Sequence, residues 1–229
     1  MSDSSRSYCS SRPAVRGEFL RGLREITRRR ERLLIFDEVI TGFRVAAGGA
    51  QERYGVIPDL TIMGKIVGGG LPAAAYGGRR ELMELVAPAG DVYQAGTLSG
   101  NPLAVAAALA TLRRLDVAAY ARIEEVTRRL ADGLREAAAS AGRELRVQSV
   151  PGLLTPFFTD QLVSDYADAA ATDQRAYGAW CRALLARGIY PPASQFEAWF
   201  PSLAHTAEHV ERTVEAAAAA FQRVAQEGA

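Results

Sequence analysis

The chain has 229 residues, which is enough for one large domain or two small ones. Its formal net charge of +1 gives no reason to expect a nucleic acid or a membrane surface as a partner. No apolar run approaches the roughly 20 residues that a membrane helix needs. The N-terminus also lacks the apolar segment of a secretory signal, so we expect a cytoplasmic protein.

The residues that commonly bind metals or form disulfides are scarce. Cys9 and Cys181 make neither a disulfide framework nor a metal cluster, and we expect both to be free thiols in a reducing cytosol. His205 and His209 are the only histidines, so we expect no metal site. The basic residues are 26 arginines and one lysine, Lys65. Any chemistry that needs a lysine therefore has one place in this chain.

The first half of the chain predicts alternating helices and strands. Residues 1–14 are rich in Ser and Arg without periodicity, and we expect them to be disordered. The apolar spacing in 18–32 predicts an amphipathic helix. The apolar run 33–36, which ends at Asp37, is typical of a parallel strand covered on both faces. The remaining predictions in this half are strands at 59–63 and 73–78 and a short helix at 80–86.

The second half begins with a strong helix start. Asn101 can cap the helix, and Pro102 suits its first position because the missing N–H costs nothing there. Further predictions are helices at 118–141, 173–187 and 206–226 and strands at 145–150 and 153–159. Together these elements predict an α/β domain with a mostly parallel sheet at 15–114. A smaller α+β domain is predicted at 115–229.

Several features that suit a ligand site follow the predicted strands, where parallel sheets bind ligands. Asp37 closes one strand, and Lys65 follows the next strand by two residues. Gly68–Gly70 would let the backbone approach a ligand closely. The turn Gly96–Gly100, ahead of the helix at Asn101, offers N–H groups and a hydroxyl to a phosphate.

Each of these features also has an ordinary explanation. Asp37 suits a turn, Lys65 suits a solvated surface, and Gly68–Gly70 suits a hinge. Their common location is what indicates chemistry. A lysine amine can form an imine with an aldehyde cofactor, and a carboxylate can keep a pyridine nitrogen protonated. The combination therefore suits a cofactor that carries an aldehyde, a pyridine ring and a phosphate.

Longer motifs support this interpretation by resemblance. DEV at 37–39, GK at 64–65 and GTLSGNP at 96–102 resemble the class III aminotransferases, which are pyridoxal-phosphate enzymes of fold type I. The resemblance extends from about Val15 to the C-terminus. The segments YQAGTLSGNPLA, SQFEA and GAQ resemble those of the glutamate-1-semialdehyde 2,1-aminomutase branch of that family.

The resemblance implies a role for each matching residue. Asp37 would pair with the pyridinium nitrogen, and Val39 would pack on the ring face. Lys65 would be the Schiff-base lysine and would shuttle protons. Gly96 and Thr97 would reach the cofactor phosphate of the other subunit in a homodimer. For Glu197 in SQFEA, the resemblance implies an active-site carboxylate near the substrate, and the alternative is a surface charge.

The implied reaction moves an amino group from C2 to C1 of glutamate-1-semialdehyde, a small amino-aldehyde. The product is the tetrapyrrole precursor 5-aminolevulinate. Pyridoxal 5'-phosphate would alternate with its pyridoxamine 5'-phosphate form. Three alternatives stay open: a related class III transaminase, a non-catalytic remnant that retains only the dimer surface and the small domain, and a split enzyme.

The chain also departs from the family pattern. Family members are about twice as long, and the part they carry before Val15 has no counterpart here. We therefore expect a truncated reading frame, a fragment of a split gene or a decayed copy. Without that part, the strand at 33–36 would expose apolar surface, so the chain would be poorly soluble or would need a complementing N-terminal half. Pro191-Pro192 and the bulky Trp199 beside Glu197 could alter substrate specificity.

Overall fold

The computed structural model describes residues 16–227, so the predicted disordered segment 1–14 lies outside the described residues. The described chain forms two compact units, 16–121 and 122–227, which divide within helix α5 (Val117–Ser140). The predicted domain boundary at 114–115 precedes this division and stays a prediction. None of the helices between residues 16 and 227 combines the length and apolar character needed to cross a membrane.

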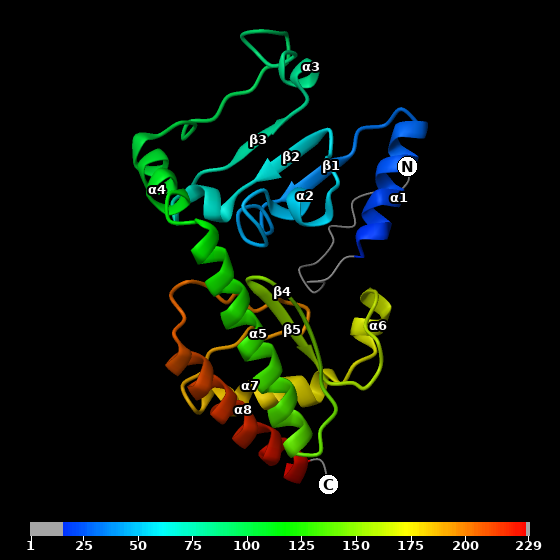
Figure 1. Cartoon of the computed structure of the whole chain (residues 1–229), viewed down its shortest axis with the longest axis vertical. Helices are drawn as coiled ribbons and strands as arrows, with labels where there is room; N and C mark the ends of the chain where they lie inside the picture. Colours follow the sequence, from blue (N-terminus) through cyan, green and yellow to red (C-terminus); the bar gives the residue numbers. More distant parts are fainter. Residues whose placement is uncertain (1–15, 228–229) are drawn as a thin grey trace. The chain divides into compact units, whose positions relative to one another are not determined.

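The first unit contains a three-stranded sheet in the order β1-β2-β3 (Figure 1). The strands are β1 (Ile35–Glu38), β2 (Leu60–Met63) and β3 (Ala75–Gly78). β1 and β2 are parallel, as the sequence predicts, whereas β3 runs antiparallel to β2.

Short helices surround this sheet. They are α1 (Gly17–Arg29), α2 (Gly49–Tyr54), the 3-10 helix η1 (Lys65–Gly68), α3 (Arg80–Met83) and α4 (Pro102–Leu112). The predicted start of α4 is confirmed, because Asn101 Oδ1 accepts the N–H of Ala104 at 2.9 Å and Pro102 holds the first position. The sequence did not predict α2 or η1.

The position and covering of β1 correct one expectation. The sequence predicted a strand at 33–36 that is covered on both faces, whereas β1 begins at Ile35 and includes Asp37 and Glu38. Only one face is covered: Glu38 is 2% exposed, but Ile35 and Ile62 on the opposite face are 50% and 42% exposed. The physical reason is that α2 covers the face that carries Glu38, whereas the described residues leave the face of Ile35 and Ile62 open.

One buried carboxylate ties the parts of this unit together. Asp59, just before β2, accepts the N–H of Leu34 at 2.7 Å and bonds from Arg24 at 2.9 Å and Arg79 at 3.1 Å. Burial by itself raises the pKa of Asp59, but these three donors outweigh burial and hold that pKa below its usual value. Asp59 thereby joins α1 to the segment before β1 and the segment after β3.

The second unit consists of the greater part of α5 and a two-stranded sheet with three more helices (Figure 1). Its elements after α5 are β4 (Arg146–Val150), β5 (Leu153–Phe157), α6 (Tyr166–Ala170), α7 (Gln174–Leu185) and α8 (Ala207–Glu227). The predicted helices correspond to α5, α7 and α8. Gly142 and Gly188 follow α5 and α7 with φ angles of 64° and 75°, which favour glycine.

Aromatic side chains fill the core of the second unit. The Trp180 indole stacks on Phe221 with ring centroids 5.0 Å apart, and on Trp199 with centroids 5.7 Å apart. The fully buried Ala217 and Ala220 on α8 let this helix approach closely. Such stacked and buried rings contribute more than their area alone, so they give this unit a substantial core of its own.

Candidate functional site

The parallel pairing of β1 and β2 brings three predicted site residues together at the carboxyl ends of these two strands. The Cα of Asp37 is in register with that of Ile62, and Lys65 follows three residues later. The N–H of Val39 donates to Asp37 Oδ1 at 3.0 Å. The carboxyl ends of these strands therefore carry Asp37, Val39 and Lys65, as the sequence predicts.

Val39 lies directly against the segment that precedes the lysine. A methyl group placed on Gly64 would lie 3.2 Å from Val39 Cγ1, which is a tight contact. The isopropyl group of Val39 therefore rests on the backbone next to Lys65. This contact gives the side chain of Val39 a defined place at the sheet edge.

Lys65 has an unusual backbone conformation. Its φ angle is 49°, in the left-handed region that residues other than glycine rarely adopt, and its side chain is exposed. Such conformations cost about 1–3 kcal/mol and concentrate at functional sites. The strain at Lys65 is therefore an independent reason to regard it as a functional residue.

One of the glycines after Lys65 serves a contact within the chain. Gly69 has a φ angle of 59°, and a methyl group on it would overlap the carbonyl of Ala107 in α4. Gly69 therefore permits a close approach to α4, and the predicted approach of Gly68–Gly70 to a ligand stays a prediction. This contact fixes the lysine turn on a helix.

Sequence reasoning missed Glu38, the neighbour of Asp37. Its buried carboxylate accepts bonds from Thr41 Oγ1 at 2.9 Å, from the N–H of Ala50 at 2.7 Å and from the N–H of Gln51 at 3.1 Å. One signal could have found it. Successive strand residues point to opposite faces, so one of two adjacent acids in a strand must face the covered side.

Gly96 and Thr97 make no hydrogen bond to the lysine turn among the described residues. They belong to the segment 91–100, which is exposed throughout and leads into the capped start of α4. The Gly69 contact involves Ala107 and Thr111, further along the same helix. The predicted reach of Gly96 and Thr97 to a partner subunit's cofactor stays a prediction.

Glu197 belongs to the second unit and lies on an anchored loop between α7 and α8. On one side of it, Gln195 is buried and its Nε2 donates to the carbonyl of Ala169 at 2.9 Å. On the other side, Trp199 pairs with Leu154 through two backbone bonds of 2.7 and 3.1 Å. Glu197 itself is exposed. The loop therefore presents its carboxylate between two fixed points.

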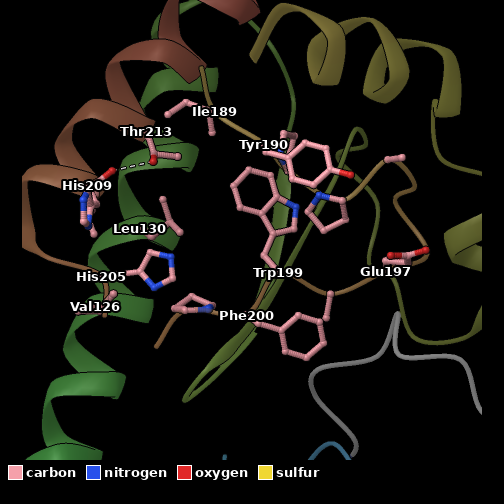
Figure 2. Close-up of a pocket in the computed structure, with 16 residues that line it drawn as sticks. Val126, Leu130, Ile189, Tyr190, Glu197, Trp199, Phe200, His205, His209 and Thr213 are labelled. Carbon is pink, nitrogen blue, oxygen red and sulfur yellow. Dashed lines mark hydrogen bonds between the residues drawn. The ribbon is translucent and has the colours of Figure 1, made fainter. Parts of the chain in front are cut away.

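A pocket of about 590 Å³ in the second unit borders this loop (Figure 2). Figure 2 shows Trp199 between Glu197 on one side and His205 and His209 on the other. The indole of Trp199 forms a wall of the pocket and also stacks in the core. The predicted effect of Trp199 on substrate specificity stays a prediction.

The two histidines make hydrogen bonds that fix their tautomers. His205 Nδ1 accepts the N–H of Ser202 at 3.0 Å, and His209 Nδ1 accepts the N–H of Thr206 at 3.1 Å. Each neutral ring therefore carries its proton on Nε2. Among the described residues, no group of three or more His, Cys, Asp or Glu side chains has the placement to hold a metal ion.

The loop is also held through the carbonyl of Pro192. This oxygen accepts a bond from the Tyr177 hydroxyl at 2.9 Å and one from Cys181 Sγ at 3.1 Å. Burial raises the pKa of the Tyr177 hydroxyl and the pKa of the Cys181 thiol. Cys181 is a buried free thiol, as predicted, whereas Cys9 lies outside the described residues.

Comparisons with known proteins agree with these features. Residues 13–221 match the model of the family "Aminotransferase class-III". The chain is 55% identical over 210 residues to the glutamate-1-semialdehyde 2,1-aminomutase of Pelotomaculum thermopropionicum, and 54% identical over 209 residues to that of Thermomicrobium roseum. These alignments include 91% of this chain but 48% and 49% of the relatives. The chain therefore spans about half the length of the curated relatives it matches.

Solved structures show the same fold. An omega-transaminase from Sphaerobacter thermophilus superposes with a TM-score of 0.85 at 36% identity. A glutamate-1-semialdehyde aminomutase from Pseudomonas aeruginosa PAO1, in complex with PMP, superposes with a TM-score of 0.80 at 26% identity. Each superposition includes 91% of this chain and 48% of the solved chain.

Proposed function

The chain belongs to the class III aminotransferase family, and on that premise we propose that it holds pyridoxal phosphate at the carboxyl ends of β1 and β2. We further propose that it serves, in the cytoplasm, the conversion of glutamate-1-semialdehyde to 5-aminolevulinate for tetrapyrrole synthesis. One observation carries the proposal. The only lysine of the chain has a positive φ angle and lies at the sheet edge that carries Asp37.

The residues at this edge fit the chemistry of that cofactor. When bound, pyridoxal phosphate supplies an aldehyde carbon and a ring that withdraws electrons. The exposed Asp37 carboxylate would hold a proton at the ring nitrogen, and Val39 would pack against the ring. The Nζ of Lys65 would hold the cofactor at its aldehyde and would move protons during the reaction.

The resemblance implies roles for two other regions, which belong to the same proposal. Gly96 and Thr97, in an exposed segment, bind the phosphate of a cofactor held by the second subunit of a homodimer. Glu197 faces the amino-aldehyde substrate from its anchored loop. These assignments follow the resemblance, and the exposure of both regions supports them.

The uncovered apolar face of β1 and β2 suggests that activity requires a further polypeptide. Ile35 and Ile62 are half-exposed, as is Tyr76 on β3. A polypeptide that corresponds to the other half of the relatives would cover these side chains and pair with the edge of β1. We therefore propose that activity resides in an assembly with such a half, and that the described chain by itself lacks turnover.

A second candidate function is transamination by the same site. The omega-transaminase superposes better on this chain than the solved aminomutase does, and its sequence is also more similar. The high identity to the curated aminomutases favours the mutase. Product analysis of the assembled enzyme separates the two, since only the transaminase needs a second amino acceptor.

The first experiment tests cofactor binding on the full chain. Pyridoxal phosphate is added at increasing concentration and fixed with borohydride, and the modified peptides are identified by mass spectrometry. We expect saturable attachment to Lys65, with the N-terminal amine as an internal reference for non-specific reaction. Equal and unsaturated labelling of both amines would contradict the proposal.

The second experiment tests the reaction. The chain is combined with a polypeptide that supplies the other half, and conversion of glutamate-1-semialdehyde to 5-aminolevulinate is measured. We expect Lys65→Ala to remove activity without preventing assembly. Activity that survives this substitution would exclude the proposed role of the lysine.

A further inference from the structure

We propose that Gln51 is a positioning residue that holds the end of β1, which carries Asp37, against the strand that leads to Lys65. The inference rests on the proposed function, because this position matters only if a cofactor binds there. It also gives a physical role to the GAQ segment, which the sequence offered only as a mark of resemblance.

The side-chain amide of Gln51 links the two strands directly. Its Nε2 donates one bond to Glu38 Oε1 on β1 at 3.2 Å, and another to Thr61 Oγ1 on β2 at 3.0 Å. Both acceptors are buried, with exposures of 2% and 8%. Both protons of the amide are therefore used, and they connect neighbouring strands on the face opposite Asp37.

The Glu38 carboxylate is itself held firmly. It accepts the backbone N–H groups of Ala50 and Gln51 in the first turn of α2. A methyl group on Gly49 would overlap Glu38 Oε2, so only glycine leaves room for the carboxylate there. Each residue of GAQ thus contributes to the contact, because Gly49 makes space, Ala50 donates, and Gln51 both donates and bridges.

The two bonds of the Gln51 side chain lie where few backbone hydrogen bonds hold the sheet together. β1 has four residues and lies at the edge of the described sheet, so few ladder bonds hold its end. Phe36 is in register with Thr61, and Glu38 with Met63, so Gln51 reaches diagonally from one pair to the next. If the end of β1 moved away from β2, Gln51 could not keep both of its side-chain bonds. Glu38 lies between Asp37 and Val39 in sequence, and a fixed Glu38 therefore directs Asp37 to the open face.

The variant that tests this is Gln51→Met, which keeps the length of the side chain and removes both donors. Thr61→Val removes one of the two acceptors with little change of shape. The matched control is Gln161→Met, because Gln161 is exposed and lies in the other unit. All three are made in the full chain, and their folding is checked by circular dichroism.

The first readout needs no cofactor. The N–H of Val39 donates to Asp37 Oδ1, so its hydrogen exchange, followed by NMR, reports the order of this strand end. We expect exchange about tenfold faster in Gln51→Met, as the loss of a bond to a charged acceptor implies. Thr61→Val should give a smaller increase, and Gln161→Met none.

The second readout uses pyridoxal phosphate. We expect Gln51→Met to raise the concentration for half-maximal attachment to Lys65 about tenfold. The pyridine nitrogen resonance of ¹⁵N-labelled cofactor should move towards its unprotonated position. A double variant that combines Gln51→Met with Thr61→Val should bind pyridoxal phosphate no more weakly than Gln51→Met alone, since the bond between Gln51 and Thr61 is already lost in the single variant.

The outcomes separate the two proposals. If wild type gives no saturable attachment to Lys65, cofactor binding by this chain fails, and the Val39 exchange still decides whether Gln51 orders the strand end. If attachment is normal and Gln51→Met changes neither readout, the inference is overturned and the proposed function stands. If Gln51→Met does not fold, Thr61→Val provides the same test with one bond removed.

Discussion

Arg24 on α1 donates a hydrogen bond from Nη1 to Asp59 Oδ2 at 2.9 Å, across 35 residues of sequence. Both side chains are largely buried, and Arg79 approaches the same carboxylate from the end of β3. The three residues form an ion-pair cluster next to the start of β2 and the end of β3. Its ionisation should govern how the first unit responds to acid.

The first prediction concerns this pH dependence. The pKa of Asp59 is lower in the folded chain than in an unfolded one, so its contribution to stability is complete above the ordinary Asp value of about 4. That contribution is lost as the pH falls through the lowered folded pKa. We expect Asp59→Asn to cost about 2 kcal/mol at neutral pH and to flatten the acid dependence. Urea unfolding followed by circular dichroism measures both effects, with the exposed Asp160→Asn as control.

The second prediction compares two glycines at the ends of α2. Gly49 and Gly55 have nearly equal φ angles of 67° and 63°, so alanine strains the backbone alike at both. At Gly55 the added methyl group meets open space, whereas at Gly49 it overlaps the Glu38 carboxylate. We expect Gly55→Ala to cost about 1 kcal/mol and Gly49→Ala at least about 2 kcal/mol more. Equal losses in urea unfolding would show that Glu38 moves aside freely.

The third prediction concerns Trp199, which packs in the core of the second unit. Trp199 is buried against Trp180, and Trp199→Ala should leave a cavity that costs about 3–5 kcal/mol. Tyr190 lines the same pocket but is 88% exposed, so Tyr190→Ala should cost far less. Differential scanning calorimetry measures both. A small effect of Trp199→Ala would mean that the indole fills space without supporting the core.

The fourth prediction concerns the open face of the sheet. Ile62→Thr removes apolar surface from a half-exposed strand position and keeps the β-branched shape. We expect the variant to bind less of an apolar dye and to stay in solution at higher concentration. Leu162→Thr is the control, because Leu162 is even more exposed but lies on a loop of the other unit. An equal gain from both would point to a general gain in surface hydrophilicity instead.

Local signals predicted much of the fold. The start of α4 at Pro102 and the ends of α5 and α7 before Gly142 and Gly188 could be predicted, because caps and left-handed glycines act within a few residues. α2 could not be predicted, since its first turn depends on the carboxylate of Glu38, 12 residues before Ala50. Contacts of that separation leave no periodic trace in a sequence.

In the candidate site, too, local signals located some residues, whereas the roles of others depended on contacts between distant segments. Asp37 and Lys65 could be located because a strand end precedes each of them. Which of the adjacent acids faces inward depended on the helix that covers Glu38, and the role of Gln51 depended on two neighbouring strands. The core packing of Trp199 was missed for a similar reason, because its stacking partner Trp180 lies on another helix.

The stacked indoles have a spectroscopic consequence. Trp180 and Trp199 are the only two tryptophans of the chain, and both belong to the unit of residues 122–227. An unfolding curve recorded by tryptophan emission therefore follows that unit and does not report the sheet that carries Lys65. A cofactor attached at Lys65 would absorb visible light in the other unit. Tryptophan emission would thus report the unit of residues 122–227, and the absorbance of a cofactor attached at Lys65 would report the other unit.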